Sequence, residues 1–184
     1  MGKVLNLELD KVWQQSRLAA DRLGHALIER GWLFACAESC TGGLLAAAMT
    51  SQPGSSAWYD RGVVTYSNEA KRQLLRVNAE TLERFGAVSE ETAMEMAGGT
   101  LVLAPAAQLS LATTGIAGPG GGVPGKPVGM VCFGLGQRTA DGVVTRAFTR
   151  VFEGNRDLVR HQAVLHALSM ALDMLTAPAA GPGA

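Results

Sequence analysis

A strand-like run that turns directly into a helix-forming run constrains the fold of this chain most. The run from Trp32 to Cys36 is apolar and suits a buried strand, and Leu44 to Met49 is rich in leucine and alanine, which favour helix. The residues between them are Ala37-Glu38-Ser39-Cys40-Thr41-Gly42-Gly43. Backbone N–H groups at such a helix start lack partners and attract anions. Two interpretations stay open: a functional turn, or an ordinary junction in which Ser39 or Thr41 is the N-cap of the helix.

The rest of the chain alternates predicted strands and helices. Strands are predicted at 32–37, 62–67, 109–114, 128–136 and 143–152, and helices at 10–30, 44–49, 69–75, 79–85, from Ser89 to before Pro105, and after Asn155. Asn68 is predicted to cap the helix at 69–75. The turn signal at 140–142 predicts that the last two strands form an antiparallel hairpin. This order predicts an α/β fold with three α/β/α layers and a mixed, mostly parallel five-stranded sheet.

Length and composition limit the class of protein. The 184 residues predict a single domain over 1–176, followed by a flexible Pro/Gly/Ala tail over 177–184. The 16 basic and 16 acidic residues balance, so no nucleic-acid partner is expected. No run approaches the roughly 20 apolar residues that a membrane span needs, so no membrane partner is expected either. Cys36, Cys40 and Cys132 do not form a disulfide framework, and free thiols predict a cytoplasmic protein.

Three predicted loops lie where a ligand is expected. In open α/β sheets, ligands bind beyond the carboxyl ends of the strands, and the Ser39 turn, the segment Asn68 to Lys71 and the glycine-rich loop 115–127 all follow strands. No histidine is predicted near Ser39, so a Ser–His–Asp triad is disfavoured and a lysine becomes the candidate base. Lys71 stands near a helix start, which disfavours its charged form. It also fits a solvated surface lysine, and the sequence leaves this alternative open.

The glycine-rich loop contains a sequence that resembles a P-loop but does not fit one. Residues 120–126 read G-x-x-x-x-G-K, yet Pro127 stands where a P-loop needs serine or threonine, and a strand follows instead of a helix. Lys126 remains a candidate point charge for a phosphate or carboxylate. No group of His, Cys, Asp and Glu has metal-ligand spacing, so neither a metal nor a cofactor is expected.

Several short motifs, taken together and in order, resemble one known family. The chain resembles the CinA C-terminal domain family, which includes stand-alone nicotinamide mononucleotide deamidases. The motifs that carry the resemblance span most of the chain: Ala37 to Gly43, Gly54 to Trp58, Arg61 to Lys71, Gly86 to Glu90, Gly115 to Pro119, and Lys126 to Gly129.

The resemblance implies a reaction and roles for individual residues. It implies hydrolysis of the carboxamide of nicotinamide mononucleotide to nicotinate mononucleotide and ammonia, without a metal or cofactor. Ser39 matches the nucleophile of the family, Lys71 its base, and Tyr66 its active-site tyrosine. A homo-oligomer is also expected. Substrate contacts are expected from Cys40, Thr41, Gly42, Gly43, Asn68, Thr114, Gly115, Ile116, Ala117, Gly118, Lys126, Arg156 and Arg160.

A non-catalytic function is the alternative. A nucleotide- or phosphate-binding module, linked through the family name to competence or the response to DNA damage, would use the same glycine turns. Such a module has no need of both Ser39 and Lys71. Release of ammonia from nicotinamide mononucleotide distinguishes the two functions.

Overall fold

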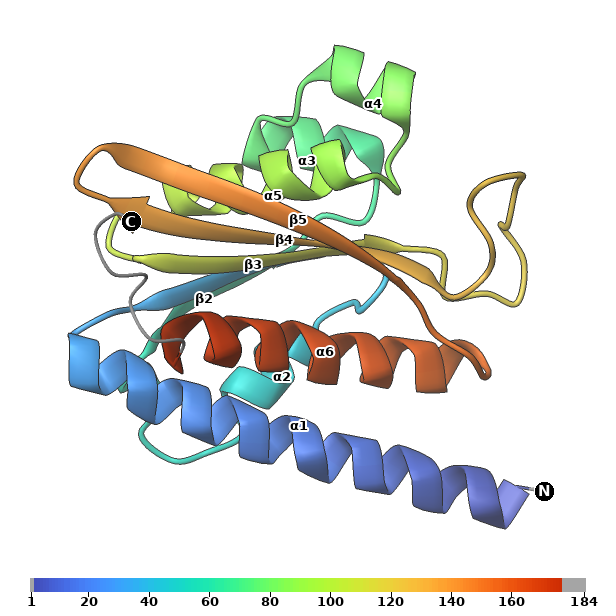
Figure 1. Cartoon of the computed structure of the whole chain (residues 1–184), viewed down its shortest axis with the longest axis horizontal. Helices are drawn as coiled ribbons and strands as arrows, with labels where there is room; N and C mark the ends of the chain where they lie inside the picture. Colours follow the sequence, from blue (N-terminus) through green and yellow to red (C-terminus); the bar gives the residue numbers. More distant parts are fainter. Residues whose placement is uncertain (1, 177–184) are drawn as a thin grey trace, which may run out of the picture.

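The structure, a computed structural model, describes residues 2–176 and places a five-stranded sheet between two layers of helices (Figure 1). The strand order is β2-β1-β3-β4-β5. β1 pairs in parallel with β2 and β3, whereas β4 pairs antiparallel with both β3 and β5. The strands are Phe34–Glu38 (β1), Tyr59–Val64 (β2), Leu109–Gly115 (β3), Met130–Thr139 (β4) and Gly142–Val151 (β5). The predicted α/β class, the mixed sheet and the final hairpin are confirmed.

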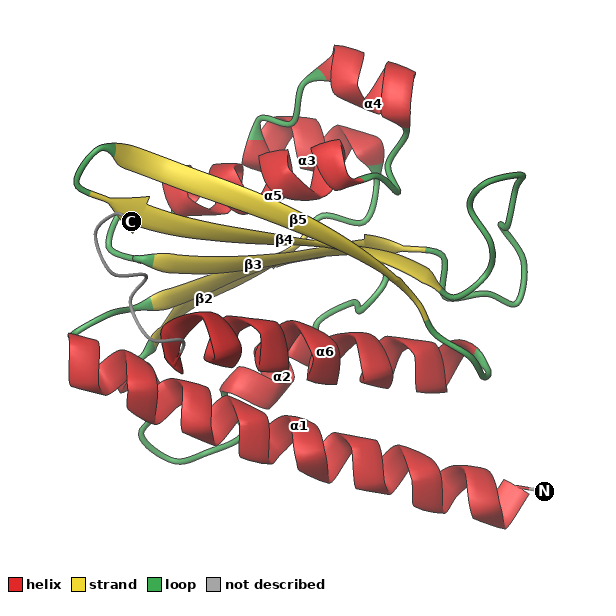
Figure 2. Cartoon of the chain, viewed as in Figure 1, coloured by secondary structure: helices red, strands yellow, loops and turns green. Residues whose placement is uncertain are grey.

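Helices cover both faces of this sheet. Figure 2 shows α3, α4 and α5 on one face and α1, α2 and α6 on the other. None of the helices in this described range is both long and apolar enough to cross a membrane. The tail predicted at 177–184 lies outside the described residues. The helices are Gly2–Arg30 (α1), Leu44–Met49 (α2), Asn68–Leu75 (α3), Ala79–Phe85 (α4), Glu90–Leu103 (α5) and Arg156–Thr176 (α6), with a 3₁₀ turn (η1) at Ser55–Ala57.

Some predicted boundaries are wrong, for physical reasons. α1 begins at Gly2 instead of residue 10. Residues 6–8 are exposed, with Leu7 at 67%, so no apolar face marks this stretch in the sequence. β2 ends at Val64, and the chain then turns into α3. Ser67, and not Asn68, caps α3: its hydroxyl accepts a hydrogen bond from the Ala70 N–H at 3.0 Å.

The centre of the sheet is packed closely on both faces. Every residue of β1 is buried. A Cβ added to Gly134 of β4 would lie 1.9 Å from the Ala93 carbonyl oxygen, so α5 rests directly on β4 at a position that only glycine allows. On the other face α6 packs between the sheet and α1, and Arg30 of α1 donates to the Leu175 carbonyl of α6 at 2.6 Å. The carboxyl ends of β1 and β3 therefore emerge from the closely packed centre of the sheet.

Candidate active site

The turn between β1 and α2 forms the centre of the candidate site. Its two glycines have positive φ angles, 58° at Gly42 and 99° at Gly43, which lets the chain reverse within a few residues. The turn is fixed to β3, because the Ser39 N–H donates to the Thr113 carbonyl at 2.9 Å. The hydroxyls of Thr41 and Thr113 also hydrogen-bond at 2.7 Å. Ser39 is therefore held at the carboxyl end of β1 by backbone and side-chain contacts.

Glu38 caps α2, a role that the sequence analysis did not predict. Its carboxylate accepts hydrogen bonds from the N–H groups of Gly43 at 2.9 Å, Leu45 at 3.1 Å and Ala46 at 2.8 Å. The side chain is 1% exposed. The expectation that Ser39 or Thr41 caps this helix is wrong, because no hydroxyl reaches the helix start. The N-terminus of α2 is already neutralised by an internal anion, so these N–H groups are not available to a substrate.

The backbone N–H groups of Cys40 and Thr41 remain available in the turn, whereas those of Gly42 and Leu44 are already bonded. The Gly42 N–H donates to the Ser39 carbonyl at 3.1 Å, and the Leu44 N–H donates to the Thr41 carbonyl at 3.3 Å. Within residues 2–176, the Thr41 N–H has no acceptor, and the Cys40 N–H contacts only the thiol of its own residue. These two groups directly follow Ser39 in the chain, which is where hydrolases with a serine nucleophile commonly place an oxyanion donor.

Lys71 reaches this turn from α3 and is buried. Its ammonium nitrogen lies 3.2 Å from Ser39 Oγ. It also donates to the carbonyls of Thr65 at 2.8 Å and Tyr66 at 3.4 Å. The residue is only 1% exposed, and no carboxylate in the described part of the chain pairs with it. The open alternative of a solvated surface lysine is therefore wrong.

Burial changes the acid–base properties of the groups around Ser39. Loss of solvation lowers the pKa of Lys71 and so favours its neutral amine. A Cys40 thiolate would oppose this shift, but burial raises the pKa of Cys40 to about 12 and keeps the thiol protonated at neutral pH. Burial likewise raises the pKa of Cys36. The lysine is thus the group near Ser39 that can accept a proton, whereas the neighbouring thiols are poor nucleophiles.

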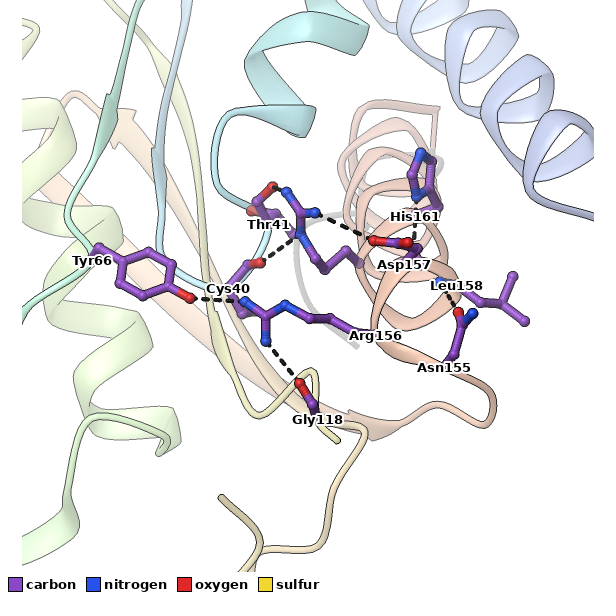
Figure 3. Close-up of polar contacts among 10 residues, drawn as sticks. Cys40, Thr41, Tyr66, Gly118, Asn155, Arg156, Asp157, Leu158 and His161 are labelled. Atoms are coloured by element: carbon purple, nitrogen blue, oxygen red, sulfur yellow. Dashed lines mark hydrogen bonds and ion pairs between the residues drawn. The ribbon is translucent and has the colours of Figure 1, made fainter. Parts of the chain in front are cut away.

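A chain of contacts links Tyr66 to the glycine-rich loop through α6. Arg156 donates to the Tyr66 hydroxyl and to the Gly118 carbonyl, both at 2.9 Å (Figure 3). Asn155 caps α6 as predicted, because its side-chain oxygen accepts from the Leu158 N–H at 2.9 Å. The Arg156 guanidinium, in the first turn of the capped helix, therefore bridges Tyr66, which follows β2, and Gly118, in the loop after β3.

Arg160, one turn further along α6, contacts the serine turn itself. Its guanidinium donates to the carbonyls of Cys40 at 3.1 Å and Thr41 at 3.0 Å, and lies 3.7 Å from the Asp157 carboxylate. Two of its nitrogen atoms thus bind protein carbonyls. Arg160 positions the turn, whereas Arg156 contacts Tyr66, which is 58% exposed (Figure 3).

Other predicted contact residues lie apart from this cluster. Lys126 donates to the Phe85 carbonyl at the end of α4, and Thr114 donates to the Ala87 carbonyl at 2.6 Å. Ala117 is buried in the core, and the backbone of Ile116 pairs with Met130 and Gly129. The structure does not bring these side chains to Ser39. Gly115 ends β3, and Asn68 opens α3 one turn before Lys71.

Two features complete the description of the site. Within residues 2–176, no group of three His, Cys, Asp or Glu side chains has the arrangement of a metal site. Glu38 is the functional residue that the sequence analysis missed. The signal available for it was an acidic residue at the last position of a buried strand, directly before a helix start, where a carboxylate has few partners other than helix N–H groups.

Known proteins are similar to this chain over most of its length. The model of the CinA C-terminal domain matches residues 16–175. The nicotinamide-nucleotide amidohydrolase PncC of Enterobacter agglomerans is 52% identical over 150 residues, which cover 82% of this chain and 89% of that protein. A CinA-like protein of Chloroherpeton thalassium is 48% identical over 157 residues, covering 85% of this chain but 37% of that protein.

A solved structure shows the same fold. The crystal structure of the competence damage-inducible protein A from Klebsiella pneumoniae matches with a TM-score of 0.82 and 43% sequence identity, and the match covers 87% of this chain and 96% of that chain. The family model spans the serine turn, the Lys71 helix, the glycine-rich loop and the two arginines of α6. By sequence and by fold, this chain belongs to the CinA C-terminal domain family.

Proposed function

We propose that this protein is a nicotinamide-nucleotide amidohydrolase that hydrolyses nicotinamide mononucleotide by a Ser39–Lys71 mechanism. The observation that carries the mechanism is the 3.2 Å contact between Ser39 Oγ and the buried amine of Lys71. The name of the Enterobacter agglomerans relative supports the substrate. A binding module would gain nothing from burying a lysine against a serine, because burial of an ammonium group costs free energy.

The first step is attack by Ser39. As a neutral amine, Lys71 has two N–H groups for the carbonyls of Thr65 and Tyr66, and its lone pair then faces the Ser39 hydroxyl. Lys71 takes the hydroxyl proton while Ser39 Oγ forms a bond to the carboxamide carbon. The carbonyl oxygen becomes an oxyanion, for which the N–H groups of Cys40 and Thr41 are the donors.

The second step releases ammonia. The C–N bond breaks, the leaving nitrogen takes the proton held by the Lys71 ammonium, and the carbonyl re-forms as an ester on Ser39. Lys71 is then neutral again and deprotonates a water molecule that attacks this ester. Cleavage of the ester bond returns the proton to Ser39 Oγ and yields nicotinate mononucleotide.

Arg156 is the basic residue best placed to recognise the substrate phosphate. Arg160 is committed to two backbone carbonyls of the turn, and Lys126 binds the Phe85 carbonyl. Arg156 lies beside the exposed Tyr66, and its guanidinium can exchange the Gly118 carbonyl for a stronger anionic acceptor. No cofactor or metal has a role in this mechanism.

The charge balance and the free thiols of the chain bear on its partners and its location in the cell. We expect residues 1–176 to act as one domain on a small molecule, without a nucleic-acid partner. The balance of 16 basic and 16 acidic residues supports this expectation. Three buried free thiols favour the cytoplasm.

The test is release of ammonia from nicotinamide mononucleotide by the native protein and two neighbouring variants. Ser39→Ala should lose nearly all turnover. Cys40→Ala should retain much of it, because the Cys40 thiol is protonated and only its backbone takes part. If a thiol-alkylating reagent inactivates the native protein but not Cys40→Ala, the nucleophile is the cysteine and the serine mechanism is wrong. No ammonia release by the native protein would favour the binding module.

A further inference from the structure

β5 is an open edge of the sheet. It is the last strand in the order β2-β1-β3-β4-β5, and in Figure 1 no described segment crosses in front of it. Its pairing with β4 is regular over all ten residues, without a bulge. The strand contains no proline, lysine or acidic residue. Proteins usually protect an edge of this length with proline, bulges or charges, because its free N–H and C=O groups otherwise pair with another strand; the charged residues of β5 are Arg146 and Arg150.

One face of β5 also exposes large apolar side chains. Phe152, just beyond the strand, contacts His166 of α6, so the even-numbered positions of β5 point to the α6 side of the sheet. On that side Val144 is 48% exposed and Phe148 is 46% exposed. They alternate with two charged residues, Arg146 and Arg150. The face is therefore a row of alternating apolar and cationic side chains.

The hairpin shows which backbone groups of β5 point outward. β4 and β5 are joined by the two-residue turn Ala140-Asp141, and Thr139 pairs with Gly142. The pair that closes such a turn is hydrogen-bonded, and hydrogen-bonded pairs then alternate along the ladder. The even-numbered residues of β5 thus bond to β4. The N–H and C=O groups of the odd-numbered residues 143, 145, 147, 149 and 151 point away from the sheet.

The order of side chains along β5 makes this edge complementary to itself. β5 can pair antiparallel with β5 of a second copy in two registers that keep the same face of both strands on one side of the sheet. The twofold axis passes through Arg146 in one register and through Ala147 in the other, and each leaves a single residue of the strand unpaired. The first places Arg146 directly against its own copy, which costs free energy. The second reduces this repulsion, because the two Arg146 side chains are then diagonal and not directly opposite. In this register Arg146 faces the partner's Phe148, and Arg150 faces the partner's Val144.

We propose that β5 is an interface at which two copies of this chain pair antiparallel about a twofold axis through Ala147. The two sheets then form one continuous sheet. On the α6 side, each Arg146 guanidinium stacks on a phenylalanine ring and each Arg150 stem covers a valine. On the other side, Val143 faces the partner's Val151 and Thr145 faces the partner's Thr149. These contacts cover the apolar side chains that the single chain leaves exposed.

A disulfide across the axis tests the register. In a hydrogen-bonded antiparallel pair the Cα atoms are about 5.5 Å apart, which a disulfide spans. Ala147→Cys should therefore give a covalent dimer under mild oxidation. Val143→Cys is the matched control, because its two copies would lie about 27 Å apart, whereas Val143→Cys combined with Val151→Cys should cross-link. The native cysteines are buried, so the unmodified protein serves as the blank. Cross-linking of the control but not of Ala147→Cys would overturn the register.

Sedimentation of the native protein tests the interface without a substitution. The native chain should sediment as a dimer that dissociates on dilution, and Ala147→Pro should raise the dissociation constant at least about tenfold. The Ala147 N–H points away from β4, so proline leaves the hairpin bonds intact. The circular dichroism spectrum of this variant should therefore match that of the native chain. A native monomer at every concentration, or a folded Ala147→Pro variant with unchanged dimerisation, would show that β5 is not the interface.

Discussion

The buried carboxylate of Glu38 provides the sharpest test of how the serine turn is held. Glu38→Gln keeps the shape of the side chain but replaces one carboxylate oxygen with an NH₂ group. The Glu38 oxygen Oε2 accepts from Gly43 and Leu45, and Oε1 accepts from Ala46. If the glutamine oxygen takes the place of Oε2 and accepts from Gly43 and Leu45, its NH₂ group points towards the Ala46 N–H. One buried N–H group then has no acceptor, and the α2 N-terminus loses its anion.

The size of the effect follows from these contacts. Loss of one hydrogen bond to a charged acceptor costs about 1.5–3 kcal/mol. Loss of the charge at a helix N-terminus adds about 0.3–1 kcal/mol. We therefore expect the free energy of unfolding to fall by about 2–4 kcal/mol. With a urea m-value of about 2 kcal/mol/M, the unfolding midpoint shifts down by about 1–2 M.

The assay is urea unfolding followed by tryptophan fluorescence, together with turnover of nicotinamide mononucleotide. Because Glu38 holds the turn that carries Ser39, kcat should fall by roughly 10- to 100-fold, since small displacements of reacting groups are costly. Glu83→Gln, on the exposed surface of α4, is the matched control and should change neither quantity. An unfolding midpoint and kcat of Glu38→Gln equal to those of the native protein would show that the carboxylate does not hold the turn.

Three further predictions concern the reaction itself. Because burial lowers the pKa of Lys71, kcat/KM should rise with pH through a midpoint below the ~10.4 of a free lysine. Lys71→Arg keeps the charge but cannot lose its proton, so it should reduce kcat on the order of 10³-fold. Turnover of this variant within tenfold of native would assign the base role to another residue, with Tyr66 the next candidate. Arg156→Ala should raise KM for the mononucleotide about 10- to 100-fold while affecting nicotinamide riboside much less, and Lys126→Ala should change neither; equal losses on both substrates would contradict a phosphate contact. Activity should survive prolonged dialysis against EDTA, and a loss that zinc or manganese restores would contradict the metal-free mechanism.

The sequence predicted the layers of the fold well because those depend on local patterns. Alternating apolar runs and breakers predicted the strands, and the turn signal at 140–142 predicted the hairpin. The start of α1 was missed, because residues 6–8 are exposed and leave no apolar face to recognise in the sequence. The cap of α3 was assigned one residue late, since Ser67 and Asn68 are both good capping residues and only the backbone angles distinguish them.

Side-chain contacts in the site were harder to predict than its location. The turn at Ser39 and the helix with Lys71 were both singled out, and the structure places the two side chains in contact; their catalytic roles stay predictions. Lys126 follows the correct strand, but its side chain points to α4. Glu38 was missed because the direction of a carboxylate depends on which N–H groups tertiary packing brings near it. Such choices depend on contacts between residues far apart in the sequence.

The role of α6 has a consequence for the order of events during synthesis. Arg160 contacts the carbonyl of Cys40 from 120 residues further along the chain. At about 5–20 residues per second, a ribosome adds those residues roughly 6–24 s after the serine turn. During that interval the nascent chain carries its nucleophile without the guanidinium groups that hold it. The enzyme should therefore be silent until α6 has been synthesised, and a message truncated before α6 should yield no partial activity.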